Sequence, residues 1–288
     1  MSSSSRFSDR WSEHHFVSFD KTVIFYRHFV PAAPPRATLL ILHGMGEHGG
    51  RYRELAEALG GAGVEAYAPD LRGFGRSGGK RGCLRRFSDY FQDLDVVERL
   101  AKQRPANLPF FILAHSFGGL VTTAWLTAGI KKEVRGLVLT SPNFGISIHV
   151  PAWRHALAIV VSVLAPDFTQ DTHVDSRFLT HDLSVFEQNK LDRLNHHLIS
   201  PGLYREMIRQ VARKNEIAEQ LTLPALVLQA GDDRVVSKRA TEIFFEHLAS
   251  KDKRLEIFPG LYHEILNETC RRDIYAKIAA WIDTKITP

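Results

Sequence analysis

Short runs of apolar residues alternate with segments of helical periodicity along most of the chain. Six runs are short and β-prone, as expected of strands covered on both faces, and they span residues 37–42, 64–69, 110–113, 134–141, 223–230 and 254–259. Apolar residues at helical spacing lie between them over residues 52–59, 87–103 and 120–126. Residues 15–27 precede these runs and alternate around Asp20 and Lys21, which predicts an antiparallel hairpin. The alternation predicts an α/β fold, with a mostly parallel central sheet and helices on both faces.

The strand pattern stops between residue 142 and about residue 220. This stretch contains a strongly apolar helix, predicted over residues 151–164, and two further amphipathic segments. We therefore predict a core made of residues 1–142 and 221–288, with residues 143–220 inserted as a helical cap. Such a cap would roof a site at the carboxyl ends of the strands and supply apolar walls for a substrate tail. Its apolar helix either lies buried between cap and core or docks on a membrane surface.

The predicted strand 110–113 runs almost directly into Ser116, which small residues flank at Ala114 and Gly118. A serine in a tight strand-to-helix turn adopts a strained backbone, and larger residues two positions away would collide with the neighbouring chain. The usual form of this nucleophile elbow is G-x-S-x-G, and Ala114 departs from it by one methyl group. The pattern predicts that Ser116 is a nucleophile; the alternative is a helix N-terminus that happens to carry a serine.

Four glycines fall within eight residues after the predicted strand 37–42, in the sequence HGMGEHGG. A loop this rich in glycine lets main-chain N–H groups point into a cavity, as an oxyanion hole requires. We expect the N–H groups of Met45 and of Phe117, which directly follows the nucleophile, to be the two donors. The alternative is a flexible turn before the next helix.

Two loops provide the remaining members of a catalytic triad. The predicted strand 223–230 delivers Asp232 and Asp233, and we favour Asp233 as the acid because one residue and then two valines follow it. Asp232 then forms the turn. His263 follows the last predicted strand, in a loop that contains a glycine, and completes the chain order Ser116, Asp233, His263.

Other charged residues near these loops are assigned structural roles. His43 and His48 precede the elbow, whereas the base comes last in this chain order, so we interpret both as residues that structure the loop. Asp70 and Arg72 lie in another glycine-rich loop and are expected to pack against its backbone.

Composition narrows the classes of function. The 288 residues are 44% hydrophobic and 24% charged, with a net charge of +5, and Lys/Arg runs never exceed two residues. Nucleic acid is therefore not an expected partner, whereas weak attraction to anionic membranes is compatible with this charge. Cys83 and Cys270 form no metal or redox spacing, and the first ten residues are polar. We expect a cytoplasmic protein with reduced cysteines, without a metal or an organic cofactor.

Together these motifs resemble the α/β-hydrolase family, and within it the monoacylglycerol lipase and lysophospholipase branch. The resemblance rests on HGMGEH with Arg51 and Tyr52, on HSFGG around Ser116, and on Tyr262-His263-Glu264. It implies that Glu47, Arg51 and His115 shape the polar end of the pocket, near the glycerol or head group. Ala114 and Phe117 depart from the family pattern, and Phe117, in place of a frequent methionine, is expected to narrow the acyl side.

The expected chemistry is acyl transfer from a lipid ester with a single acyl chain to water. His263 would take the proton of Ser116, Ser116 would attack the ester carbonyl, and water would release the acid. A serine aminopeptidase, an amidase or a short-chain carboxylesterase could use the same residues, because the elbow does not select the leaving group. A ligand-binding protein without catalysis is the alternative outside the enzymes.

Overall fold

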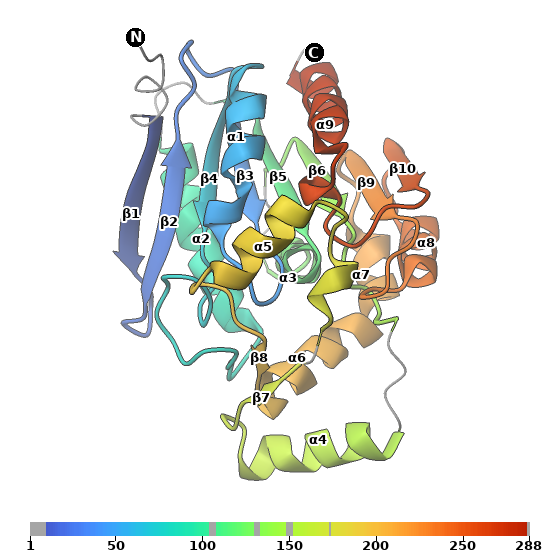
Figure 1. Cartoon of the computed structure of the whole chain (residues 1–288). Coiled ribbons are helices and arrows are strands. Elements are labelled where there is room, and N and C mark those ends of the chain that lie inside the picture. The colour runs from blue at the N-terminus through green and yellow to red at the C-terminus, as the bar shows by residue number, and fades with distance from the viewer. Residues whose placement is uncertain (1–9, 104–107, 130–132, 148–151, 173, 287–288) are drawn as a thin grey trace.

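A computed structural model describes residues 10–103, 108–129, 133–147, 152–172 and 174–286. An eight-stranded sheet runs through the centre of the molecule (Figure 1). Its strands lie in the order β1 (Trp11–Val17), β2 (Val23–Phe29), β4 (Val64–Pro69), β3 (Ala37–Leu42), β5 (Phe110–His115), β6 (Gly136–Thr140), β9 (Ala225–Ala230) and β10 (Lys253–Phe258). The strands from β4 to β10 pair in parallel, and β1 and β2 form the antiparallel hairpin. The predicted α/β class is confirmed.

Helices cover both faces of the sheet (Figure 1). On one face, α1 (Arg53–Gly60) and α9 (Arg271–Ile286) share an apolar core with the strands. On the other face lie α2 (Ser88–Lys102), α3 (Phe117–Leu126) and α8 (Lys238–His247). Every residue of β3, β4, β5, β6 and β9 is buried as a result, which explains why their sequences are apolar runs rather than alternating patterns.

The six predicted strands agree with the structure to within two residues at each end. The helix after Ser116 differs more, because it begins at Phe117 and not at Leu120. Gly118 and Gly119 hide the helical pattern in the sequence, since glycine is a poor helix former. The fold requires them: an added Cβ at Gly118 would lie 2.5 Å from the carbonyl oxygen of His43, and one at Gly119 would lie 2.9 Å from Pro142.

The segment between β6 and β9 lies beyond the carboxyl ends of the parallel strands (Figure 1). It holds α4 (Ala152–Leu164), β7 (Gln170–Asp171), a 3-10 turn (Ser176–Phe178), α5 (Leu183–Leu191), β8 (Leu198–Ile199), α6 (Pro201–Ala212) and α7 (Lys214–Gln220). The prediction of a segment without strands was wrong, because β7 and β8 pair with each other. Two-residue strands are too short to produce a detectable period. In the described residues, no helix is long and apolar enough to cross a membrane.

The two ends of this segment differ in their attachment to the rest of the molecule. Residues of α6 and α7, such as Leu203, Met207 and Ile217, are buried in the same apolar cluster as α3 and β5. Helix α4 packs mainly on α6 and leaves much of its apolar surface in solvent. The sequence left open whether this helix is buried or exposed, and the structure excludes the buried alternative.

Candidate active site

The turn between β5 and α3 holds Ser116 in a strained conformation. Its φ of 50° and ψ of −117° lie where residues with side chains are rarely found. Small neighbours make the turn feasible: Ala114 is completely buried at the end of β5, and Gly118 faces the carbonyl oxygens of Leu42 and His43. Ser116 therefore stands at a strand-to-helix elbow, at the N-terminus of α3.

Ser116, His263 and Asp233 form a continuous chain of hydrogen bonds. The distance from His263 Nε2 to Ser116 Oγ is 2.9 Å, and that from His263 Nδ1 to Asp233 Oδ2 is 2.8 Å. A histidine that donates from Nδ1 to the carboxylate leaves Nε2 free to accept the hydroxyl proton. The three residues follow β5, β9 and β10, so the parallel sheet brings their loops together from distant parts of the sequence.

The loop after β9 selects Asp233 rather than Asp232. Asp233 Oδ1 accepts hydrogen bonds of 2.9 Å from the main-chain N–H groups of both Val235 and Val236. Asp232 is exposed, and its main-chain N–H donates to the carbonyl of Leu261. The structure thus brings together the three residues that the chain order singled out, and the two N–H groups of the valines orient the carboxylate.

The electrostatic environment favours a protonated intermediate of His263. Burial acts to lower its pKa, but the Asp233 carboxylate, with further contributions from Glu264 and Glu47, raises the pKa above its ordinary value. His115 is buried beside it, and burial together with the charge of His263 lowers the pKa of His115 to about 4. Near neutral pH, His115 is therefore neutral.

The glycine-rich loop after β3 curves over Ser116. Gly46 has φ +82° and leaves no room for a side chain, since an added Cβ would lie 2.5 Å from the carbonyl oxygen of His196. Met45 lines the cavity beside Ser116. In the described part of the chain, no acceptor is found for the main-chain N–H groups of Met45 and Phe117. Among the described residues, both N–H groups are thus left without a partner and could donate to a ligand.

The side chain of Phe117 does not narrow the cavity, so this expectation was wrong. It is completely buried and packs edge-on against the rings of Phe87 and Tyr90, with Phe74 also close. A residue at the first position of α3 points its side chain back toward the turn that precedes it, here into the core. The main-chain N–H of Phe117 therefore lies at the site, whereas its ring packs in the apolar core.

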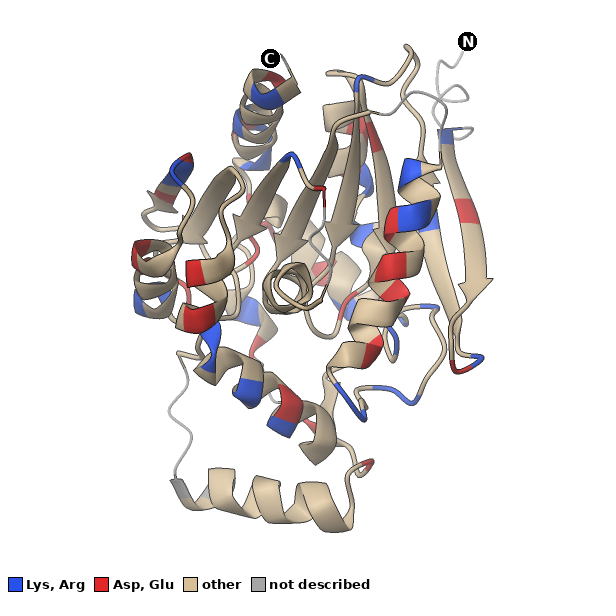
Figure 2. Cartoon of the chain, turned by 180° about the vertical axis from the view of Figure 1, so that it is seen from behind, with Lys and Arg blue, Asp and Glu red and all other residues tan. Residues whose placement is uncertain are grey.

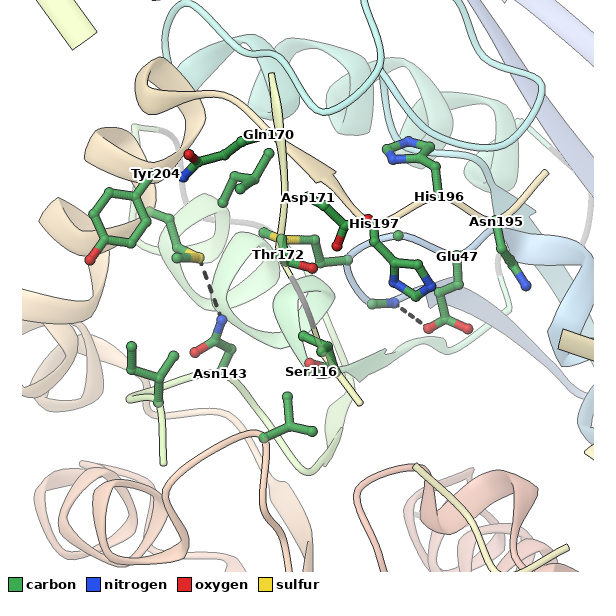
Figure 3. Close-up of a pocket in the computed structure, with 18 of the residues that line it drawn as sticks. Glu47, Ser116, Asn143, Gln170, Asp171, Thr172, Asn195, His196, His197 and Tyr204 are labelled. Carbon is green, nitrogen blue, oxygen red and sulfur yellow. Dashed lines mark hydrogen bonds between the residues drawn. The ribbon is translucent and has the colours of Figure 1, made fainter. Parts of the chain in front are cut away.

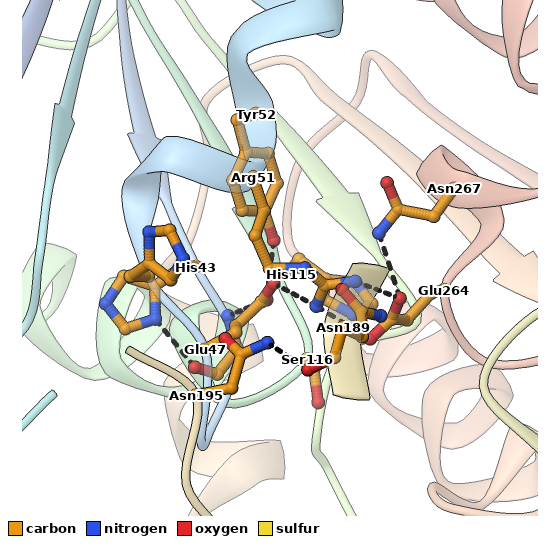
Figure 4. Close-up of polar contacts among 12 residues, drawn as sticks. His43, Glu47, Arg51, Tyr52, His115, Ser116, Asn189, Asn195, Glu264 and Asn267 are labelled. Carbon is orange, nitrogen blue, oxygen red and sulfur yellow. Dashed lines mark hydrogen bonds and ion pairs between the residues drawn. The ribbon is translucent and has the colours of Figure 1, made fainter. Parts of the chain in front are cut away.

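A buried ion-pair network connects the glycine-rich loop to the histidine loop (Figure 4). Arg51 contacts Glu47 at 2.7 Å and binds both carboxylate oxygens of Glu264, at 2.9 and 2.6 Å. Glu47 in turn accepts hydrogen bonds from the N–H of Gly44 at 2.5 Å and from the hydroxyl of Tyr52 at 2.8 Å. Burial acts to raise the pKa of Glu264, but Arg51 outweighs it and holds the pKa at about 2. Glu264 directly follows the histidine, so Arg51 joins the two loops.

The remaining charged residues near the site have structural contacts, as predicted. His43 accepts a hydrogen bond from the N–H of Leu71, and its other ring nitrogen contacts the carbonyl of Gly44. His48 accepts from the N–H of Gly50 and pairs with Asp192 at 2.7 Å.

Asp70 and Arg72, which were predicted to pack against the backbone of their loop, agree with that prediction only in part. Asp70 accepts from the main-chain N–H groups of Gly49 and Arg76, as expected. Arg72 instead pairs with the side chains of Asp20 and Asp93, because a guanidinium is best satisfied by carboxylates.

A cavity of about 1150 Å³ opens at Ser116 under the segment between β6 and β9. Glu47, Asn195 and His197 lie on one side of Ser116, and Asn143 and Tyr204 lie on the other (Figure 3). Apolar side chains from α4, α6 and the loop after β9 also line the cavity: Leu157, Val161, Met207, Val235 and Val236. Among the described residues, no group of three or more His, Cys, Asp or Glu side chains could hold a metal ion.

The sequence did not single out roles for three residues of this cavity. Glu264 is adjacent to His263, and that adjacency is the one signal that could have drawn attention to it. Asn143 and Asn195 both have a buried side-chain oxygen without a partner in the described part of the protein. Neither belongs to a motif, so only the folded structure points to them.

The sheet order and the elbow between β5 and α3 are those of an α/β-hydrolase. A family model described as "Serine aminopeptidase, S33" matches residues 33–270, so the chain belongs to this family of α/β-hydrolases. The chain is accordingly a hydrolase.

Curated relatives cover nearly the whole chain. It is 33% identical to the monoacylglycerol lipase of Mycolicibacterium smegmatis, over 94% of this chain and 96% of that one. It is also 33% identical to phospholipase YtpA of Bacillus subtilis, over 88% and 97%. The crystal structure of the Paleococcus ferrophilus monoacylglycerol lipase is 29% identical and superposes with a TM-score of 0.82, over 91% of this chain and 99% of that one.

Proposed function

We propose that this protein hydrolyses lipid esters that carry one acyl chain, through a covalent acyl-enzyme on Ser116. The hydrogen-bonded chain from Ser116 through His263 to Asp233 carries this proposal. His263 accepts the proton as Ser116 attacks the ester carbonyl, and Asp233 stabilises the resulting imidazolium. The N–H groups of Met45 and Phe117 bind the oxyanion. The imidazolium of His263 then gives its proton to the departing alcohol, which leaves the acyl-enzyme on Ser116. Neutral His263 next takes a proton from water, the resulting hydroxide attacks the acyl carbonyl, and the fatty acid is released as Ser116 regains its proton.

The form of the cavity supports a lipid substrate. Its volume of about 1150 Å³ lies just above the usual range for small-molecule sites. The apolar side chains of α4 and α6 provide a wall for an acyl chain. On the opposite side, Asn195 offers an unpartnered side-chain oxygen to a hydroxyl such as those of glycerol. Relatives named monoacylglycerol lipase and phospholipase agree with this substrate class.

An aminopeptidase is the second candidate, because the family description names that activity. A free substrate amine would need an available carboxylate in the pocket. Glu47 and Glu264 both pair with Arg51, Asp192 is paired with His48, and Asp171 also has an interaction partner, so each of these carboxylates is already engaged within the protein. This distribution of charge favours an ester over an aminoacyl substrate.

Glu47, Arg51 and His115 are proposed to shape the polar end of the pocket. All three residues line the cavity. Most hydrogen bonds of Glu47 and Arg51, however, join these two residues to each other, to Glu264 and to the loop backbone. We therefore assign them a positioning role behind the alcohol part of the substrate. His115, held by Nδ1 against the carbonyl and hydroxyl of Thr140, presents its neutral ring to the same end.

Residues 143–220 are proposed to act as a lid, with α4 as its membrane-facing edge. Val160, Val163 and Leu164 of α4 are 56, 70 and 80% exposed, and Trp153 at its start is 62% exposed. Arg154 is the only Lys, Arg, Asp or Glu in the sequence of this helix, and the part from His155 to Leu164 is tan throughout in Figure 2. An exposed apolar helix face of this kind is typical of transient contact with a lipid surface. The cytoplasmic location stays a prediction.

Parallel kinetics on four substrates test the proposal: monodecanoylglycerol, decanoyl lysophosphatidylcholine, p-nitrophenyl acetate and leucine p-nitroanilide. We expect the highest kcat/KM on monodecanoylglycerol, because the polar end of the cavity offers neutral hydrogen-bonding groups that suit glycerol. Preference for the lysophospholipid would change only the head group that we assign to the substrate, and the proposal of an ester with one acyl chain would stand. Fastest cleavage of the anilide would contradict the ester assignment, and activity on the acetate alone would contradict the lipid assignment.

A further inference from the structure

The two sides of the cavity around Ser116 differ in chemistry (Figure 3). Glu47, Asn195 and His197 make one side polar. Ile146, Met207, Val235 and Val236 also line the cavity, and a plain acyl chain would fit against them without any hydrogen bond. Asn143 lies on the side opposite Glu47 and contacts Met207, whereas the hydroxyl of Tyr204 on that side is engaged by His155.

Asn143 is close to the nucleophile in the fold. It follows β6, and its main-chain N–H donates a hydrogen bond of 2.9 Å to the main-chain oxygen of Ser116. This contact involves the backbone alone, so a residue with any side chain could make it. The carboxamide itself is therefore not required for the connection between the β6 loop and the elbow.

The carboxamide of Asn143 is poorly satisfied within the protein. The residue is only 7% exposed, and its Oδ1 is buried without a hydrogen-bond partner in the described residues. Its Nδ2 contacts the thioether sulfur of Met207 at 3.5 Å, and sulfur is a weak acceptor. Burying an amide in this way costs folding free energy, whereas an apolar residue of similar size would not. A polar group that destabilises the free protein is often explained by the ligand that it binds.

We infer that Asn143 is a specificity-determining residue that binds a hydroxyl group on the acyl chain, close to the ester carbonyl. The inference rests on the proposed ester hydrolysis at Ser116. Because the backbones of residues 143 and 116 are hydrogen-bonded, the carboxamide can reach substrate atoms only near the scissile bond, at about the second or third carbon of the acyl chain. A hydroxyl there both donates and accepts: it donates to Oδ1, and it accepts from Nδ2 in place of the weak contact with Met207. A plain methylene leaves the amide unsatisfied.

The test compares p-nitrophenyl esters of decanoic, 2-hydroxydecanoic, 3-hydroxydecanoic and 10-hydroxydecanoic acid. These esters share one leaving group, so the result does not depend on the alcohol that the enzyme prefers. We expect kcat/KM on the 2-hydroxy or the 3-hydroxy ester to exceed that on the decanoate by about tenfold, the effect of one well-placed hydrogen bond. The 10-hydroxy ester should show no such gain, because its hydroxyl lies far from Ser116.

Two variants connect the preference to the carboxamide. In Asn143→Leu, the ratio between the favoured hydroxy ester and the decanoate should fall by about tenfold. In Met207→Leu, which removes the sulfur but keeps the amide, the ratio should persist. Each ratio is taken within one variant, so a general loss of activity cancels.

Two outcomes would overturn the inference: a wild-type enzyme that prefers the decanoate over both the 2-hydroxy and the 3-hydroxy ester, and a preference that survives in Asn143→Leu. Neither result would affect the proposed function, which the comparison of the four substrates above tests separately and which would also fail if none of the decanoyl esters were hydrolysed. The wild-type comparison remains decisive even if the Asn143→Leu protein does not fold.

Discussion

The loops at the carboxyl ends of the strands and the segment between β6 and β9 face each other across the same cavity, but they are built differently. In the loops, each functional side chain is buried and held by several partners, as Asp233 is held by His263, Val235 and Val236. In the segment, α4 has few polar contacts and exposes its apolar side chains. Catalytic geometry needs a rigid frame, whereas a lid must move and contact different surroundings. With residues 143–220 acting as the proposed lid, the reaction and the delivery of the substrate would be assigned to different parts of the molecule.

If this separation is correct, changes in the loops should affect every substrate. The largest effect is expected for Ser116→Ala, which removes the nucleophile. Hydrolysis of short and long esters should fall by about 10⁴-fold or more, since a triad without its serine retains only binding and oxyanion stabilisation. Circular dichroism should be unchanged, and a serine-directed phosphonate should label the wild type but not the variant. Undiminished hydrolysis by the variant would remove Ser116 from the mechanism.

A somewhat smaller loss is expected for Asp233→Asn, of about 10⁴-fold at most, because His263 loses the partner that fixes its tautomer. Asp232→Asn is the matched control, and it should differ little from the wild type because its side chain is exposed. Steady-state kinetics with an activated ester measure both. Equal losses in the two variants would argue that the loop as a whole matters, and not the carboxylate of Asp233.

Glu264→Gln should separate positioning from catalysis. Breaking the buried pair with Arg51 should destabilise the protein by about 3 kcal/mol or more and lower kcat by roughly tenfold, because the loops of His263 and Gly44 are no longer joined. Glu54→Gln, which removes a half-buried pair with Arg271 but leaves Arg271 paired with Asp182, should cost about 1 kcal/mol or less. Urea denaturation and kinetics give the two quantities.

The pH dependence of kcat/KM tests the role of Glu264 further, because a purely structural role of this residue would leave that dependence unchanged. His263 must be neutral to accept a proton, so kcat/KM falls below its pKa. Glu47, Glu264 and Asp233 raise that pKa above 6.5, so the acidic limb in the wild type should lie above pH 6.5. Removing the charge of Glu264 should shift this limb to lower pH. An unchanged limb would contradict a coupling between Glu264 and His263.

The smallest effects on chemistry should come from the lid. The double variant Val163→Asp/Leu164→Asp should hydrolyse p-nitrophenyl acetate normally but lose about tenfold in activity on monoacylglycerol presented in vesicles, because two charges oppose insertion of α4. Leu183→Asp/Leu191→Asp on α5 is the control, with side chains of similar exposure, 77 and 78% against 70 and 80%. Co-sedimentation with vesicles measures binding directly. An equal loss in both variants would indicate a general effect of charge and not contact through α4.

Much of this architecture could be predicted from local patterns. Strands β3 and β4 match their predicted ranges, because short, mostly apolar runs in which every residue is buried leave few alternatives. The chain order of Ser116, Asp233 and His263 singled out three residues among many of the same kind. Phe117 shows where such reasoning fails: its position in the motif placed it at the site, but only its main-chain N–H lies there, since the direction of a side chain depends on packing.

By itself, the sequence determined the α/β fold, the elbow at Ser116 and the spacing that favours Asp233 over Asp232, because each depends on backbone requirements that neighbouring residues express. The tertiary structure alone decided the partnership of Arg51 with Glu264, more than 200 positions away, the exposure of α4 and the unpartnered amide of Asn143. These features depend on which surfaces meet when the strands align. No local pattern records whether a buried polar atom finds a partner there.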